Sequence, residues 1–132
     1  MKVKDVPQDG RILESSTVRD LCYAIDENGD YKQIPSVGWD AKNVALDYTW
    51  DSIYNESEEI KREVLAGEKS PLAYHLHRLV MTPQILSDYS GFSKREIKRW
   101  CKKKHFENLN SAQLDKLATS LRISVEQLTS LD

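Results

Sequence analysis

The spacing of apolar and polar residues changes along the chain and divides it into segments. Residues 1–16 are polar and show neither a helical nor a strand period, which is typical of an irregular arm. Residues 21–25 and 31–35 are short runs of strand-forming residues. Between them, Asn28 and Gly29 are suited to the positive-φ positions of a tight turn. This part of the sequence therefore predicts a β-hairpin.

A helical period follows from about residue 41 to residue 66. Apolar residues step by three, four and seven positions and form one stripe, consisting of Leu46, Trp50, Ile53, Ile60 and Val64. The other face is mostly acidic, and Gly67 provides a positive-φ stop. At ~1.5 Å per residue the helix would be about 40 Å long, more than a small domain needs. We expect the stripe to pack in a core or to contact a partner, either a second copy or another protein.

Residues 70–132 have the pattern of a series of short helices. Ser70-Pro71 and Thr82-Pro83 each place a capping hydroxyl before a proline at the first helical position. The expected helices span residues 71–80, 83–90, 94–103, 111–121 and 125–131. The predicted fold class is mainly α, with a hairpin and a long helix in residues 1–69 followed by a five-helix domain in residues 70–132.

The second and third of these short helices form a recognisable pair. In the second helix, Ile85, Leu86 and Tyr89 are spaced to form an inward face. Gly91 ends this helix, and Ser93 caps the next one after a short turn. Two helices joined by a short glycine-containing turn are the local pattern of a helix-turn-helix.

The third short helix belongs to a strongly basic segment, residues 94–104. It holds seven basic residues and one acidic residue, a net charge of +6. On a helical wheel Ile97, Trp100 and Cys101 lie on one side and the basic residues on the other. Such a helix can bury one face in its own domain and present the other to a polyanion, although basic residues also simply keep exposed helices soluble. The candidate DNA-binding residues are Lys94, Arg95, Lys98, Arg99, Lys102, Lys103 and Lys104.

Two segments, residues 81–100 and 109–128, resemble the helix-turn-helix of the Cro and lambda-repressor family. The first matches the family pattern at Thr82, Leu86, Gly91, Phe92, Ser93 and Ile97. The second matches it at Leu114, Leu117, Ala118, Leu121, Ser124, Val125 and Leu128. The resemblance implies a five-helix lambda-repressor-like domain and a small transcriptional regulator, of the bacterial or phage kind, that binds double-stranded DNA.

The resemblance also implies roles for single residues. The helix after the turn would lie in the major groove, with Arg95 best suited to sequence choice because a guanidinium can bind guanine through two hydrogen bonds. Residues 102–104 would lie nearer the DNA backbone. The chain departs from the family at Pro83, where a glutamine usually contacts the backbone, and at Ser90, where an apolar residue is usual. These departures favour an alternative, a protein-interaction module on a drifted helix-turn-helix scaffold.

The net charge of −2 conceals an asymmetry between the two halves of the chain. Residues 1–70 contain nine basic and fifteen acidic residues, a net charge of −6. Residues 71–132 contain ten and six, a net charge of +4. A basic half beside an acidic half indicates either a nucleic-acid partner for the basic one, with RNA open as well as duplex DNA, or an unequal charge decoration of two solvated surfaces.

Other classes of function receive little support from the sequence. No apolar run reaches the length of a membrane span and no secretory signal begins the chain, so we expect a cytoplasmic protein. We expect Cys22 and Cys101 to be reduced and structural, and His75 and His77 to point to different faces of a helix, so no metal or cofactor is expected. Because no phosphate loop or activated nucleophile is recognisable, we expect no enzyme activity. Membrane-surface binding is disfavoured because the core needs the apolar face of the basic helix.

Overall fold

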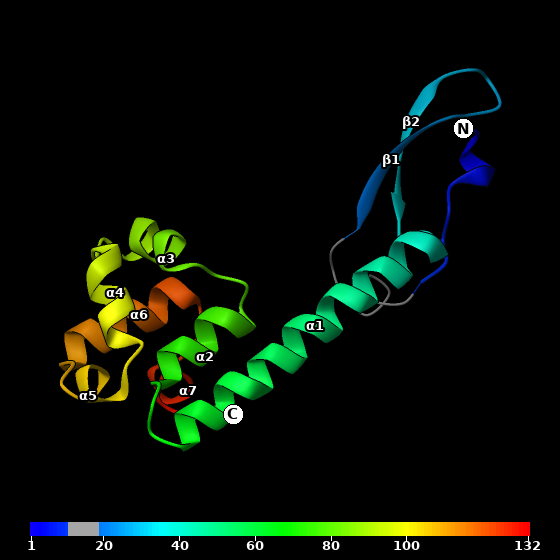
Figure 1. Cartoon of the computed structure of the whole chain (residues 1–132). Helices are drawn as coiled ribbons and strands as arrows, with labels where there is room; N and C mark the ends of the chain where they lie inside the picture. The colour runs from blue at the N-terminus through cyan, green and yellow to red at the C-terminus, as the bar shows by residue number, and fades with distance from the viewer. Residues whose placement is uncertain (11–18) are drawn as a thin grey trace. The chain divides into compact units, whose positions relative to one another are not determined.

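The computed structural model describes residues 1–10 and 19–132, so residues 11–16 of the predicted arm lie outside the described part. It divides into two compact units, residues 1–51 (unit 1) and 52–132 (unit 2). The division falls inside the long helix α1 (Asp40–Leu65), whereas the boundary drawn from the sequence lies between residues 69 and 70. The predicted fold class is confirmed, because the chain is mainly helical with a hairpin before the helices (Figure 1).

Unit 1 contains the predicted hairpin. Strand β1 (Asp20–Ile25) pairs antiparallel with β2 (Tyr31–Ser36), in a register that sets Ile25 opposite Tyr31. In the turn, the Asp26 carboxylate accepts hydrogen bonds from the backbone amides of Asn28 (2.8 Å) and Asp30 (3.0 Å). Of the two residues expected at positive φ, Gly29 has it (φ 86°) and Asn28 does not. An aspartate-stabilised turn thus closes the hairpin.

The described part of the N-terminal arm crosses one face of this hairpin. It begins with a short 3-10 helix, η1 (Val3–Asp5). The Met1 carbonyl accepts a hydrogen bond from the Ile25 amide (2.9 Å), and the Asp9 amide donates to the Gly38 carbonyl (2.9 Å). These contacts lie at opposite ends of the hairpin, so hydrogen bonds hold the arm to the hairpin at both ends.

Helix α1 confirms the long helix expected for residues 41–66. It ends as expected at Gly67, which has a φ of 81° and donates its amide to the Val64 carbonyl (3.0 Å). The apolar stripe is partly covered, because Trp50 is 46% exposed and the remaining members are half-buried: Leu46, Ile53, Ile60 and Val64.

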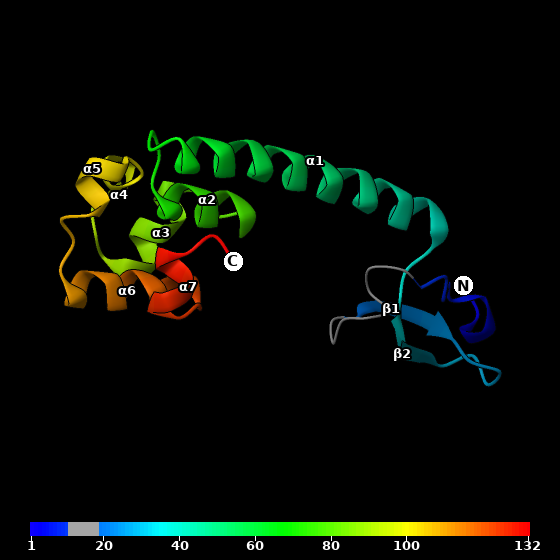
Figure 2. The ribbon, with the colours of Figure 1, turned by 90° about the horizontal axis from the view of Figure 1, so that it is seen from below.

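Unit 2 gathers the short helices into one bundle (Figures 1 and 2). They are α2 (Pro71–Arg78), α3 (Pro83–Ser90), α4 (Lys94–Trp100), α5 (Lys103–Phe106), α6 (Ser111–Leu121) and α7 (Val125–Thr129). Helix α3 packs against α4 and α6, and α2 packs against α7. The buried apolar core of unit 2 is formed by Leu72, Leu76, Leu86, Ile97, Trp100, Phe106, Leu117, Ala118, Leu121 and Leu128.

One histidine lies inside this bundle. His75 on α2 is fully buried, with Nε2 3.0 Å from the Ser130 carbonyl and Nδ1 3.2 Å from Nη2 of Arg78. Because a guanidinium can only donate, Nδ1 accepts, and the proton lies on Nε2 and is donated to Ser130. Burial lowers the pKa of His75, and the charge of Arg78 lowers it further. Neutral His75 therefore ties α2 to the segment that follows α7.

The basic segment 94–104 is not one helix, and the helix expected at residues 94–103 is wrong at its C-terminus. Helix α4 ends at Trp100, Lys102 is extended (φ −95°, ψ 133°), and α5 begins one residue later. The cause lies in Ser70, whose hydroxyl donates to the Trp100 carbonyl (2.6 Å) and whose amide donates to the Cys101 carbonyl (2.8 Å). A continuing helix would need these carbonyls for residues 104 and 105. Ser70 therefore stops α4. The sequence had predicted that its side chain caps α2, and this prediction is wrong.

The inward face expected for α3 is confirmed at Leu86 and wrong at Ile85 and Tyr89. Leu86 and Ser90 are buried, whereas Ile85 is 38% exposed and Tyr89 is 70% exposed. Residues four apart lie on the same side of a helix, so Leu86 shares the buried side with Ser90, whereas Ile85 and Tyr89 share an exposed side. Two other helices end earlier than expected, α2 at residue 78 and α7 at residue 129.

Candidate nucleic-acid interface

The turn between α3 and α4 is built by local capping chemistry. The Thr82 hydroxyl accepts a hydrogen bond from the Ile85 amide (3.2 Å) at the start of α3, and Pro83 occupies the first helical position. At the other end Gly91 adopts a left-handed conformation (φ 75°) and donates its amide to the Ser87 carbonyl (2.8 Å). The capping hydroxyl of Thr82 and the stop at Gly91 that the sequence predicted are therefore both present in the structure.

Helix α4 begins with a capping box. The Ser93 hydroxyl accepts a hydrogen bond from the Glu96 amide (3.2 Å), and the Glu96 carboxylate accepts one from the Ser93 amide (2.9 Å). The hydrogen bonds from the Ser93 hydroxyl and amide hold the pKa of Glu96 below its usual value. The one acidic residue of the basic segment is thus used to start the helix.

Two buried residues anchor α4 in unit 2. Ile97 is fully buried and Trp100 is 3% exposed. The ring of Phe92, in the turn, meets the Trp100 ring edge to face, with centroids 4.9 Å apart at 84°. Together these contacts fix the rotation of α4 about its axis, and so fix which of its side chains face water.

The outward side of α4 is a basic surface. Lys94, Arg95, Lys98 and Arg99 are all exposed. In the described part of the chain, no carboxylate lies within ion-pair distance of these four side chains. The structure therefore brings four of the seven predicted residues together on one helix face, which we call the α4 basic face.

The other three predicted residues lie outside this helix. Lys102 is in the connection, and Lys103 and Lys104 are in the first turn of α5. All three are exposed, but the Lys103 ammonium lies 3.8 Å from a Glu107 carboxylate oxygen. Burial and the nearby cations, Lys104 first among them, lower the pKa of His105. These residues form a second basic group after the end of α4, close enough to the α4 basic face for Arg99 to help lower the pKa of His105.

A further cation lies over the turn and was missed in the sequence. The Lys116 ammonium of α6 is 4.8 Å from the centroid of the Phe92 ring, a cation–π distance. It would also lie 3.6 Å from a Cβ added at Gly91. Nothing in the local pattern around Lys116 signals this contact, because it depends on how α6 packs against α3.

The structure explains one departure from the family pattern. Ser90 is buried, donates its hydroxyl to the Leu86 carbonyl (2.6 Å) and accepts from the Phe92 amide (3.3 Å). Its polar group is therefore satisfied inside the bundle. The half-buried Pro83 supplies no side-chain donor, and the amide of the adjacent, exposed Gln84 donates to Asp88 (2.9 Å).

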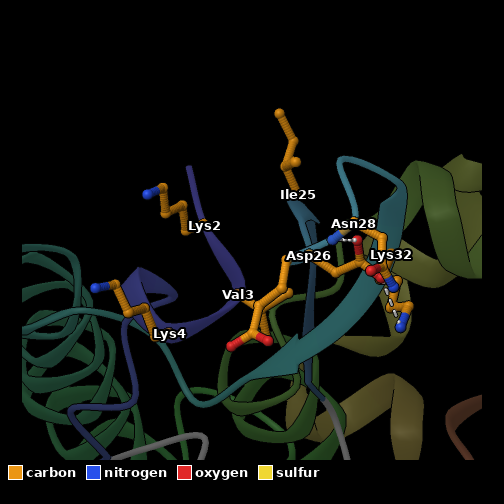
Figure 3. Close-up of a pocket in the computed structure, with 8 residues that line it drawn as sticks. Lys2, Val3, Lys4, Ile25, Asp26, Asn28 and Lys32 are labelled. Atoms are coloured by element: carbon orange, nitrogen blue, oxygen red, sulfur yellow. Dashed lines mark hydrogen bonds and ion pairs between the residues drawn. The ribbon is translucent and has the colours of Figure 1, made fainter.

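A separate surface pocket of about 720 Å³ lies at the turn end of the hairpin in unit 1. Figure 3 shows Lys2 and Lys4 extending from the arm, while Lys32 pairs with Asp26 (2.8 Å) on the hairpin. That ion pair is the main cause of the lowered pKa of Asp26. Because Lys32 is paired and the arm lysines point elsewhere, the pocket has no converging charge for a ligand.

The described residues contain neither a candidate metal site nor a candidate membrane span. No group of three or more His, Cys, Asp or Glu side chains there is arranged to hold a metal ion. None of the described helices combines the length and apolar character needed to cross a bilayer. Cys22 and Cys101 are both free, and burial raises the pKa of the Cys101 thiol to about 11.

Comparisons with known proteins gave no relative. No protein-family model, no curated protein and no solved structure matched the chain.

Proposed function

We propose that this protein binds double-stranded DNA with α4 in the major groove and acts as a small transcriptional regulator in the cytoplasm. The observation that carries the proposal is the α4 basic face, whose four cations are exposed and have no carboxylate partner among the described residues, while the same helix is anchored by Ile97 and Trp100. A rigid helix with free cations can neutralise phosphates and reach base edges. The capped turn before α4 is the usual support for such a helix.

The residues before and after the break at Lys102 would make different contacts with DNA. The α4 basic face would contact bases and nearby phosphates. Among its residues, Arg95 would contribute most to the preference for a DNA sequence. Lys102, Lys103 and Lys104 would contact the DNA backbone, and Lys103 would contribute less because Glu107 is near it.

Substitution of Arg95 and Lys102 tests this division. Fragments bound by the protein are first selected from the source genome. Arg95→Ala is expected to cost about 1–3 kcal/mol on a selected site and to relax sequence preference, because it removes a bidentate contact to a base. Lys102→Ala is expected to weaken binding to all DNA sequences alike. It is also expected to reduce the slope of log K against log salt concentration by the amount that corresponds to about one phosphate contact.

Lys4→Ala is the matched control, since it removes an equal charge from an exposed lysine in unit 1. It is expected to leave binding unchanged. Binding that Arg95→Ala and Lys102→Ala both leave intact would contradict the proposal.

A second candidate function is a protein-interaction module on the same scaffold. It is favoured by exposed apolar side chains on α3, at Ile85 (38%) and Tyr89 (70%), and just before it, at Val80 (57%). Val80 also has a φ of 54°, a conformation that is costly for a β-branched residue. No retention of DNA at low salt, together with capture of a protein that Tyr89→Ala releases, would favour this function over DNA binding.

A partner for residues 41–66 also belongs to the proposal, either a second copy or another protein. The predicted stripe is largely half-buried within the two units. The large side chains of α1 that remain exposed are Val44, Tyr48, Trp50, Tyr54 and Leu65. A contact through this segment would therefore use these residues more than the stripe.

A further inference from the structure

One face of the hairpin is left uncovered by the described residues of unit 1. Successive side chains of a strand point to opposite faces, and the face crossed by the arm contains the fully buried Ala24. The opposite face, which we call the outer face, consists of Leu21, Tyr23, Ile25, Tyr31, Gln33 and Pro35. Leu21 is 55%, Tyr23 61% and Tyr31 75% exposed. A two-stranded sheet is marginal without further cover, so burial of this face would stabilise unit 1.

The outer face carries no charge although the chain around it is acidic. Residues 1–51 contain six basic and ten acidic residues, a net charge of −4, and none of these belongs to the outer face. A charged partner surface would lose water there without gaining an opposite charge. A second, identical face is neutral and apolar and incurs no such cost.

The polar groups of the outer face complement themselves. The Gln33 amide donates to the Tyr23 hydroxyl oxygen (3.0 Å). Within the described residues, the Tyr23 O–H and the Gln33 carbonyl oxygen make no other hydrogen bond. In a two-fold contact the Tyr23 O–H of each copy can donate to the Gln33 carbonyl oxygen of the other copy. The two symmetric hydrogen bonds would give both groups a partner in both copies.

The edges of the hairpin are less suited to a partner than its outer face. The arm occupies the β1 edge at Ile25 through the bond from its amide to Met1. On β2, Pro35 has no amide hydrogen, and its carbonyl accepts from the Gln8 side chain (2.9 Å). Addition of a further strand to the sheet is therefore disfavoured, and a contact between faces remains.

We propose that a second copy of this chain packs on the outer face, sheet against sheet, to form a two-fold dimer. The contact itself needs no DNA. Its use rests on the proposed function, because helix-turn-helix proteins that bind two half-sites do so as dimers. Two copies joined in this way would bring two α4 basic faces to one DNA molecule.

The test measures the mass of the full chain in solution, without DNA, by sedimentation equilibrium from about 1 to 100 μM. The unsubstituted chain is expected to dimerise. Leu21→Asp combined with Tyr31→Asp is expected to raise the dimer dissociation constant by about a hundredfold or more, because it desolvates charge in an apolar contact. Trp39→Asp combined with Thr119→Asp is the matched control, since it places the same two charges on exposed residues outside both the outer face and residues 41–66. Tyr48→Asp, at a residue of α1 that is 82% exposed, is a separate variant that tests the alternative contact through residues 41–66.

A milder variant keeps the test decisive if the double variant fails to fold. Tyr23→Phe retains the ring and loses the O–H, and it is expected to weaken the dimer about tenfold. A monomeric unsubstituted chain would overturn the proposal, as would a dimer that survives these substitutions. Dissociation by Tyr48→Asp alone would place the contact in residues 41–66 and overturn it too. Because the test contains no DNA, these outcomes decide the dimer proposal whether or not the protein binds DNA.

Discussion

Ser90 shows how one residue can depart from a family pattern without loss of the fold. From the sequence, a serine at a usually apolar position indicated a drifted scaffold. In the structure its hydroxyl makes two hydrogen bonds, to the Leu86 carbonyl and from the Phe92 amide. The sequence identifies the position, but these partners depend on the turn geometry that Gly91 creates. Pro83 therefore remains the departure that bears on DNA binding.

His75 is expected to make the stability of unit 2 depend on pH. Its pKa in the folded chain lies below the ordinary value of 6.5, so the unfolded chain binds the proton more readily. The stability that neutral His75 contributes is present above pH 6.5 and is lost as the pH falls from there through the lowered pKa. The titration of one proton can change the free energy of unfolding by at most about 1.4 kcal/mol per pH unit.

Urea unfolding from about pH 7.5 to pH 5 measures this slope. His105→Gln is used as the background, because the pKa of His105 is also lowered. In that background His75→Gln, whose amide can still donate to Ser130, is expected to flatten the profile. An equal slope with and without His75→Gln would show that the buried histidine does not titrate as described.

At the scale of elements, helix starts were easier to predict than helix ends. Thr82, Ser93, Asn110 and Ser124 each accept a backbone hydrogen bond at a helix N-terminus, and this chemistry is contained in a few neighbouring residues. The end of α4 is different, because it is set by Ser70, thirty residues away. The basic segment alone therefore predicted one helix where the structure has two.

Substitution of Ser70 tests this explanation of the break. Ser70→Ala removes the donor to the buried Trp100 carbonyl and is expected to lower the free energy of unfolding by about 1–3 kcal/mol. Ser111→Ala is a matched control, because Ser111 is exposed at the start of α6. Denaturant unfolding compares the two variants. Equal stability would mean that the Ser70 hydroxyl does not hold the end of α4.

At the scale of the whole molecule, the charge asymmetry is smaller than the sequence halves indicated. The division at residue 70 gave −6 and +4. Divided by the compact units, residues 1–51 carry −4, and residues 52–132, with thirteen basic and eleven acidic residues, carry +2. The acidic turns of α1 thus belong to the same unit as the α4 basic face. The argument for a polyanion rests on the local arrangement of four cations and not on net charge.

Salt dependence of duplex DNA binding tests the central proposal most directly. The full chain is titrated with random-sequence duplex from about 50 to 200 mM salt, a range over which counterion release gives a linear fall of log K with log salt concentration. We expect this slope to be steep and negative. Lys94→Ala and Lys98→Ala are each expected to reduce it by the amount that corresponds to about one phosphate contact, whereas Lys4→Ala is expected to leave it unchanged. No retention of DNA at about 50 mM salt, or binding that salt does not weaken, would contradict the assignment of the α4 basic face to DNA.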